Sequence, residues 1–153
     1  MDGFHLSNAE LVRLGRRDRK GAIDTFDASG YRALLRRLRD QGDDIVYAPE
    51  FDRTIEEPIG GAIPVLRDAP LVITEGNYLL VDEHPWSELR ELIDEIWYLD
   101  PEEDVRLERL IARHIAYGKP PELARAWSLG TDQRNAELIA ATRSRADRVI
   151  RLA

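Results

Sequence analysis

Three acidic residues stand where a loop or the end of a strand is expected: Asp2, Asp52 and Glu75. A carboxylate beside a substrate hydroxyl can take its proton as a general base, and one beside Mg²⁺ can bind the ion directly or through water. Glu75 follows the apolar run 71–74, and ligands of open α/β sheets bind beyond the carboxyl ends of the strands. The alternative interpretation is that all three are ordinary solvated acids.

Three arginines, Arg106, Arg109 and Arg113, recur at spacings of three and four residues. In a helix this spacing places them on one face. Guanidinium groups suit phosphate oxygens, so this face could clamp the phosphates of a nucleotide. Acids at positions 102, 103, 104 and 108 could instead neutralise the arginines, as on an ordinary charged and solvated face.

The apolar run 71–74 predicts a strand buried on both faces, as in parallel sheets. Further strands are expected at 45–48, 96–99 and 149–152, and a tight turn at 60–61. Helices are predicted to start near Ser7, to follow Asp27 and end at Gly42, to lie around 86–93, to start at Asp100–Pro101, and to run from 122 towards 145 with a break near Gly130. This alternation predicts an α/β protein with a parallel sheet, and the length of 153 residues predicts a single domain over 1–153.

Composition argues against several classes of protein. The three histidines follow no zinc-ligand spacing, and the absence of cysteine rules out disulfides and thiolate chemistry. A net charge of −7 argues against general nucleic-acid binding. The sequence has no apolar run long enough for a transmembrane helix and no signal peptide, so we expect no membrane partner and a cytoplasmic location.

Five segments, in order, resemble the P-loop small-molecule kinases related to uridine kinase, bacterial pantothenate kinase and phosphoribulokinase. They are 1–6 (MDGFHL), 49–53 (PEFDR), 72–78 (VITEGNY), 106–114 (RLERLIARH) and 135–147. Together they extend over nearly the whole chain. Leu110 departs from the pattern, since a second consecutive arginine is common there among uridine kinases.

The resemblance implies a role for each matched residue. Asp2 would be the general base on the acceptor hydroxyl, and Glu75 would serve the Mg²⁺ shell, through water, or the substrate. The acceptor pocket would be lined by Phe4, His5, Asp52, Arg53, Asn77 and Tyr78, while Arg106, Arg109 and Arg113 would close over the phosphates from a lid-like segment at about 106–121. The cofactors would be ATP and Mg²⁺, the partner a small-molecule substrate, and dimers are common among such kinases.

One family feature is missing, because no G-x-x-x-x-G-K-[ST] motif occurs in the sequence. The only lysines, Lys20 and Lys119, stand outside any such pattern. In the family the P-loop precedes the Asp-Gly-Phe segment, so we interpret the sequence as the C-terminal part of a longer kinase, truncated before the P-loop strand and first helix. We therefore expect this chain to bind ATP poorly, and the strand at 71–74 to lack a neighbour and to favour self-association.

Two functions follow from these observations. The first is an ATP-dependent kinase that phosphorylates a hydroxyl of a small metabolite such as a nucleoside, pantothenate or a sugar, and that is inactive as this P-loop-less chain. The alternative is a non-catalytic module, derived from such a kinase, that binds a metabolite or a partner. A hydrolase with paired carboxylates has little support, because no spacing fixes two acids across a scissile bond. The sequence does not choose the acceptor.

Overall fold

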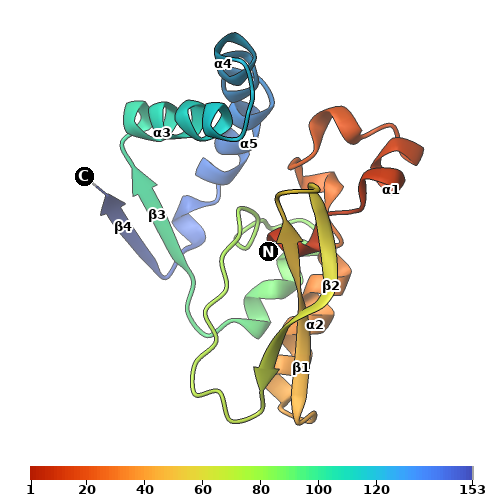
Figure 1. Ribbon diagram of the computed structural model, residues 1–153. Coiled ribbons are helices and arrows are strands. Elements are labelled where there is room, and N and C mark those ends of the chain that lie inside the picture. Colours follow the sequence, from red (N-terminus) through yellow and green to blue (C-terminus); the bar gives the residue numbers. More distant parts are fainter. Residues whose placement is uncertain (153) are drawn as a thin grey trace. The chain divides into compact units, whose positions relative to one another are not determined.

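The computed structural model describes residues 1–152, and the chain divides into two compact units, Met1–Asp94 and a second unit from Glu95 onward. The elements of the first unit (Figure 1) are η1 (Asp2–Phe4), α1 (Asn8–Arg13), η2 (Arg17–Arg19), η3 (Ile23–Thr25), α2 (Ala28–Asp40), β1 (Ile45–Asp52), β2 (Glu57–Leu66) and η4 (Trp86–Leu92), where η denotes a 3₁₀ helix.

Side-chain caps begin both α-helices of the first unit where the sequence predicts them. The hydroxyl of Ser7 accepts a hydrogen bond from the Glu10 amide, and the carboxylate of Asp27 accepts one from the Gly30 amide. In α2, Tyr31 and Leu35 are buried on one face, as the apolar spacing predicts. The helix ends at Asp40, and its C-cap residue Gln41 takes the left-handed conformation one position before the expected Gly42.

The strand expected at 45–48 forms the first half of β1, which is the first strand of a β-hairpin. β1 and β2 pair antiparallel, from Ile45 opposite Leu66 to Asp52 opposite Glu57. The expected turn at 60–61 is wrong, because both glycines lie inside β2 and the chain reverses over 53–56. Pro58 and Pro64 fit β2 because one of its edges is unpaired, and proline removes only an N–H donor.

The prediction of a buried strand at 71–74 is wrong. These residues belong to no strand, and the side chains of Leu71, Val72 and Ile73 are 72%, 43% and 85% exposed. A strand needs a neighbour to accept and donate its backbone hydrogen bonds. Within residues 1–152 no segment pairs with 71–74, so the apolar run stays extended and uncovered.

The core of the first unit forms between α1, α2 and the 3₁₀ helix η4. Leu11, Tyr31, Tyr78 and Leu89 are at most 2% exposed. The helix expected at 86–93 is the 3₁₀ helix η4, whose first residue, Trp86, packs with its ring 5.4 Å from that of Tyr78. These large side chains give α2 and the segment around Tyr78 a common hydrophobic anchor.

The second unit pairs two parallel strands and adds three α-helices and one 3₁₀ helix (Figure 1). Its elements are β3 (Trp97–Pro101), α3 (Glu103–Ala116), α4 (Pro121–Leu129), α5 (Thr131–Ala140), η5 (Arg143–Arg145) and β4 (Arg148–Leu152). The parallel pairing of β3 with β4 agrees with the predicted α/β class. The break between α4 and α5 falls at Gly130, where the sequence predicts it. α3 begins at Glu103, not at Asp100, because Asp100 and Pro101 are still paired with β4. No helix in residues 1–152 is long and apolar enough to cross a membrane.

Candidate functional site

The site in the first unit is built around Asp2, on the short helix η1. This helix lies against β1 at Gly3, where an added Cβ would sit 2.4 Å from the carbonyl oxygen of Pro49. Any other residue at position 3 would force η1 and β1 apart, so glycine sets the place of Asp2. The side chain of Asp2 is 42% exposed, which leaves its carboxylate accessible to a substrate.

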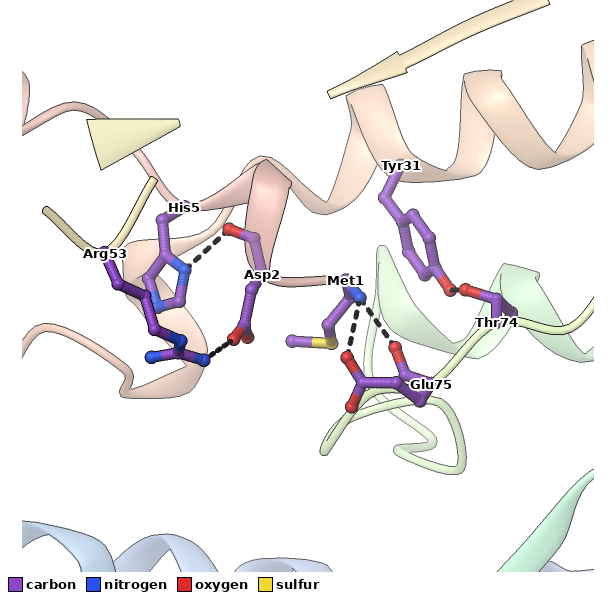
Figure 2. A network of polar contacts seen from close by, with 7 residues as sticks. All are labelled: Met1, Asp2, His5, Tyr31, Arg53, Thr74 and Glu75. Carbon is purple, nitrogen blue, oxygen red and sulfur yellow. Dashed lines mark hydrogen bonds and ion pairs between the residues drawn. The ribbon is translucent and has the colours of Figure 1, made fainter. Parts of the chain in front are cut away.

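Asp2 holds partners through both its side chain and its backbone (Figure 2). Nη2 of Arg53 donates to Oδ2 of Asp2 over 2.9 Å. The ring of His5 lies 2.8 Å from the Asp2 carbonyl oxygen through Nδ1. Because a carbonyl oxygen only accepts, Nδ1 carries the proton in this contact, and neutral His5 keeps its lone pair on Nε2.

Glu75 lies next to this group through Met1 (Figure 2). The amino group of Met1 lies 2.7 Å from the Glu75 carbonyl oxygen and 3.3 Å from its Oε1. The Met1 side chain packs against Gly76, where a Cβ would come within 2.3 Å of its sulfur. One residue before Glu75, the Thr74 hydroxyl lies 2.6 Å from the Tyr31 hydroxyl, which fixes the segment to α2. The structure thus brings Asp2 and Glu75, 73 positions apart in the sequence, to one place.

The residues around Glu75 fit a magnesium ion held largely by water and phosphate. The Glu75 side chain is 82% exposed, and no group of three potential metal ligands occurs within residues 1–152. Mg²⁺ often uses one or two carboxylates together with substrate phosphates and waters. A single accessible carboxylate meets that requirement, while a site made of protein ligands alone does not form from the described residues.

Aromatic rings form the floor beside Asp2. His5 stacks between Phe26 and Phe51, with ring centroids 4.0 and 5.0 Å away, and Phe4 lies 5.0 Å from Tyr31. Burial among these rings lowers the pKa of His5, because a charged imidazolium loses its hydration there. His5 and Phe4, both predicted to line the acceptor pocket, therefore lie next to Asp2.

The remaining predicted pocket residues differ in their surroundings. Asp52 accepts hydrogen bonds from the backbone and hydroxyl of Thr54, at 2.8 and 2.6 Å, and these bonds lower its pKa. Tyr78 is fully buried and its hydroxyl donates to the Gly21 carbonyl oxygen over 2.7 Å. Asn77 is exposed. Asp52 thus shapes the hairpin turn and Tyr78 the core, and the assignment of these three residues to a substrate pocket stays a prediction.

In the second unit, the three arginines of α3 divide into two kinds. Arg106 makes two hydrogen bonds to Glu103, at 2.8 and 2.7 Å, and one of 2.6 Å to Gln133 of α5. Arg109 and Arg113 are exposed and form no ion pair with any other residue of the described chain. Arg106 braces α3 in this structure, whereas Arg109 and Arg113 present guanidinium groups to solvent.

Sequence reasoning missed Lys20 and Phe51 as part of the Asp2 surroundings. Nζ of Lys20 lies 4.9 Å from the centroid of the Phe51 ring, and it donates to Oδ1 of Asn8 and to the Glu56 carbonyl oxygen. Partial burial lowers the pKa of Lys20. The available signal was that Lys20 is one of two lysines in the chain.

Two solved structures share this fold. The crystal structure of a "putative fructose transport system kinase" from Silicibacter sp. TM1040 matches with a TM-score of 0.90 and 37% sequence identity, over 98% of this chain and 72% of that one. The structure of YFH7 from Saccharomyces cerevisiae, described as "a putative P-loop containing kinase with a circular permutation", matches with a TM-score of 0.81 over 99% of this chain and 56% of that one. At 21% identity, the second match shows the fold alone.

Sequence comparison identifies the family. No family model matches the chain. An ATP-dependent kinase-like protein from Aspergillus versicolor, notR', is 34% identical over 152 residues, which cover 94% of this chain and 88% of that protein.

The chain belongs to the P-loop kinase family.

Two further relatives are longer than this chain. A protein named as a putative uridine kinase from Schizosaccharomyces pombe is 38% identical over 122 residues, and the match spans 52% of its length. A pantothenate kinase from Corynebacterium glutamicum is 32% identical over 126 residues, and the match spans 39% of its length. The suspected family and the α/β class are thus confirmed.

Proposed function

We propose that this chain provides the acceptor side of an ATP-dependent kinase that phosphorylates a hydroxyl group of a small metabolite. The observation that carries the proposal is the accessible Asp2 carboxylate next to Glu75, in a chain of the P-loop kinase family. The relatives named for uridine and pantothenate, and the solved kinase named for fructose transport, support nucleosides, pantothenate and sugars as the acceptors to test.

In the proposed reaction Asp2 takes the proton of the acceptor hydroxyl. The hydroxyl oxygen forms a bond to the γ-phosphorus of ATP, the bond between that phosphorus and the β,γ-bridging oxygen breaks, and ADP leaves. Phosphoryl transfer of this kind needs positioning and charge neutralisation more than covalent chemistry. Arg109 and Arg113, which have no acidic partner in the described chain, would neutralise phosphate oxygens. Glu75 would hold Mg²⁺ through water, and the bound ion would neutralise further phosphate charge.

The nucleotide side of the reaction is only partly encoded in these 153 residues, because they contain no P-loop motif. The backbone cradle and the phosphate-binding lysine of that motif supply much of the affinity for ATP in P-loop proteins. We therefore propose that the chain alone binds ATP poorly. Isothermal titration calorimetry with Mg-ATP should give a dissociation constant in the millimolar range or no detectable binding. A micromolar dissociation constant would contradict this expectation.

A second function, a non-catalytic binding module, has one specific observation in its favour. The 153 residues contain no P-loop motif, yet they cover 88% of the kinase-like Aspergillus protein. The DNA upstream of the Met1 codon separates the two functions. An in-frame segment that encodes a strand and G-x-x-x-x-G-K-[ST] supports the kinase, while a ribosome-binding site directly before Met1 supports the module.

The experiment that tests the kinase proposal is a coupled ADP-release assay with the product of the complete reading frame. Mg-ATP and a panel of hydroxylated metabolites, namely uridine, pantothenate and fructose, are supplied one at a time. Acceptor-dependent release of ADP, with mass-spectrometric detection of the phosphorylated acceptor, supports the proposal. Nucleotide turnover that ignores every acceptor, or no turnover at all across a broad panel, contradicts it.

A further inference from the structure

The contact between Asp2 and Arg53 points to a property of the acceptor. Arg53 is the first residue of the turn between β1 and β2, and the hydrogen bonds from Thr54 to Asp52 fix the shape of that turn. The turn thereby carries the Arg53 guanidinium to the Asp2 carboxylate, 2.9 Å away (Figure 2). The side chain of Arg53 is 48% exposed, so solvent and ligands can reach it.

Two cations, Lys20 and Arg53, lie beside the Phe51 ring, and Glu56 and Glu57 lie close enough to Lys20 to raise its pKa, against the larger lowering by burial. Lys20 lies 4.9 Å and the Arg53 guanidinium 5.8 Å from the Phe51 ring, and both cations lower the pKa of the neighbouring His5, although burial has the larger effect. The charge of Asp2 acts in the opposite direction and raises the pKa of His5. If Asp2 turned towards a substrate hydroxyl, Arg53 would lose its contact with this carboxylate.

The ion pair also opposes the role proposed for Asp2. Oδ2 of Asp2 already accepts a hydrogen bond from Arg53, so this oxygen is occupied when a substrate hydroxyl approaches. Arginine keeps its proton in proteins, so Arg53 stays charged when Asp2 turns to a substrate, and an anionic group of the substrate can take the place of the Asp2 carboxylate. The planar guanidinium fork binds a carboxylate or a phosphate group well.

We infer that the acceptor carries an anionic group, carboxylate or phosphate, and that this group binds Arg53 and takes it from Asp2. The inference rests on the proposed function for the role of Asp2. In it, Arg53 is a specificity-determining residue that recognises the anion and at the same time frees the carboxylate to accept a hydroxyl proton. Lys20, which is held by hydrogen bonds to Asn8 and Glu56, would attract the same anion electrostatically.

Binding measurements on the 153-residue chain test the inference with matched probes. Pantothenate and pantothenyl alcohol differ in a carboxylate, and fructose 6-phosphate and fructose differ in a phosphate, so the two pairs distinguish the sources of the charge. Calorimetry should give an affinity about tenfold or more higher for the anionic member of at least one pair, as expected for a charged hydrogen-bonded contact.

Variants locate the effect. Arg53→Gln should remove the preference for the anionic probe and leave the neutral one unchanged, while Arg67→Gln, which removes a guanidinium of similar exposure paired with Asp44, should preserve the preference. Asp2→Asn should increase affinity for the anionic probe by about two- to fivefold, because Arg53 no longer has a competing carboxylate. Circular dichroism of each variant checks that it folds.

Three results would overturn the inference. They are equal affinities within both probe pairs, no binding of either anionic probe, and weaker binding of the anionic probe by Asp2→Asn. The kinase proposal fails separately, in the ADP-release assay. Equal affinities together with efficient phosphorylation of a neutral acceptor would refute the anionic acceptor and leave the kinase function standing.

Discussion

Removing the Tyr31 hydroxyl should change stability in opposite directions at neutral and at alkaline pH. Tyr31 is 2% exposed, and its hydroxyl lies 2.6 Å from that of Thr74, which precedes Glu75. At pH 7, Tyr31→Phe loses this hydrogen bond and leaves the Thr74 hydroxyl without it. The expected cost is about 1 kcal/mol of unfolding free energy.

At alkaline pH the same hydroxyl becomes a liability. Burial raises the pKa of Tyr31 from 10.0 to about 12, so the folded protein keeps the phenol neutral while the unfolded chain ionises. The stabilisation is fully present below pH 10 and is lost as the pH rises towards 12, by about 3 kcal/mol in total. About half of that loss falls below pH 11, so the stability curves of the wild type and Tyr31→Phe should cross near pH 11.

Urea denaturation of both proteins at half-unit intervals from pH 8 to 11.5 measures this crossing. Thr74→Val is the matched control, because it removes the same hydrogen bond and keeps the phenol. Its stability should fall with pH as the wild type does, and the double variant should cost less than the sum of the two single changes. A difference between the wild type and Tyr31→Phe that stays constant across the range would refute the reasoning.

Three further changes test other parts of the structure. Burial lowers the pKa of His5, so its contribution to stability is present above about pH 6.5 and is lost as the pH falls below it. His5→Gln should therefore lose less stability between pH 7.5 and 5 than the wild type does. As a control, the variant His84→Gln, at an exposed position, should lose as much as the wild type. Ile73 is 85% exposed, so Ile73→Ser should change the unfolding free energy by less than about 0.5 kcal/mol. The same variant should reduce self-association, measured by sedimentation velocity. An unchanged distribution of monomer and oligomers would count against self-association through this exposed apolar segment. Leu35→Ala empties a buried position of α2 and should cost about 3 kcal/mol in denaturant unfolding, while its exposed neighbour Arg36→Ala should cost less than about 0.5 kcal/mol.

Local signals in the sequence predicted the elements that depend on local chemistry. Ser7 and Asp27 cap their helices, and Gly130 separates α4 from α5, because capping and helix termination involve only a few consecutive residues. The prediction of a buried strand at 71–74 was wrong for the opposite reason. Its apolar composition is typical of a buried strand, but pairing depends on a neighbour elsewhere in space, which residues 1–152 do not provide.

The candidate site shows the same division. The resemblance to P-loop kinases selected Asp2, His5, Arg53 and Glu75, and the structure brings these four together within the first unit. The ion pair between Asp2 and Arg53 joins residues 51 positions apart and depends on how the hairpin turns, so no spacing rule could reveal it. For α3, the sequence predicts the same role for all three arginines. Only the structure shows that Arg106 is hydrogen-bonded to Glu103 and Gln133, whereas Arg109 and Arg113 are exposed.

The proposed role of Asp2 as general base is tested most directly by the rate of phosphoryl transfer in Asp2→Asn. With the product of the complete reading frame, Mg-ATP and the best acceptor of the panel, kcat should fall by about 10²- to 10⁴-fold, because general-base catalysis contributes that much. Asp68→Asn, an exposed acid of the same unit, is the control and should keep the wild-type rate. A value of kcat for Asp2→Asn within about threefold of the wild type, in a folded protein that still binds the acceptor, would contradict the assignment.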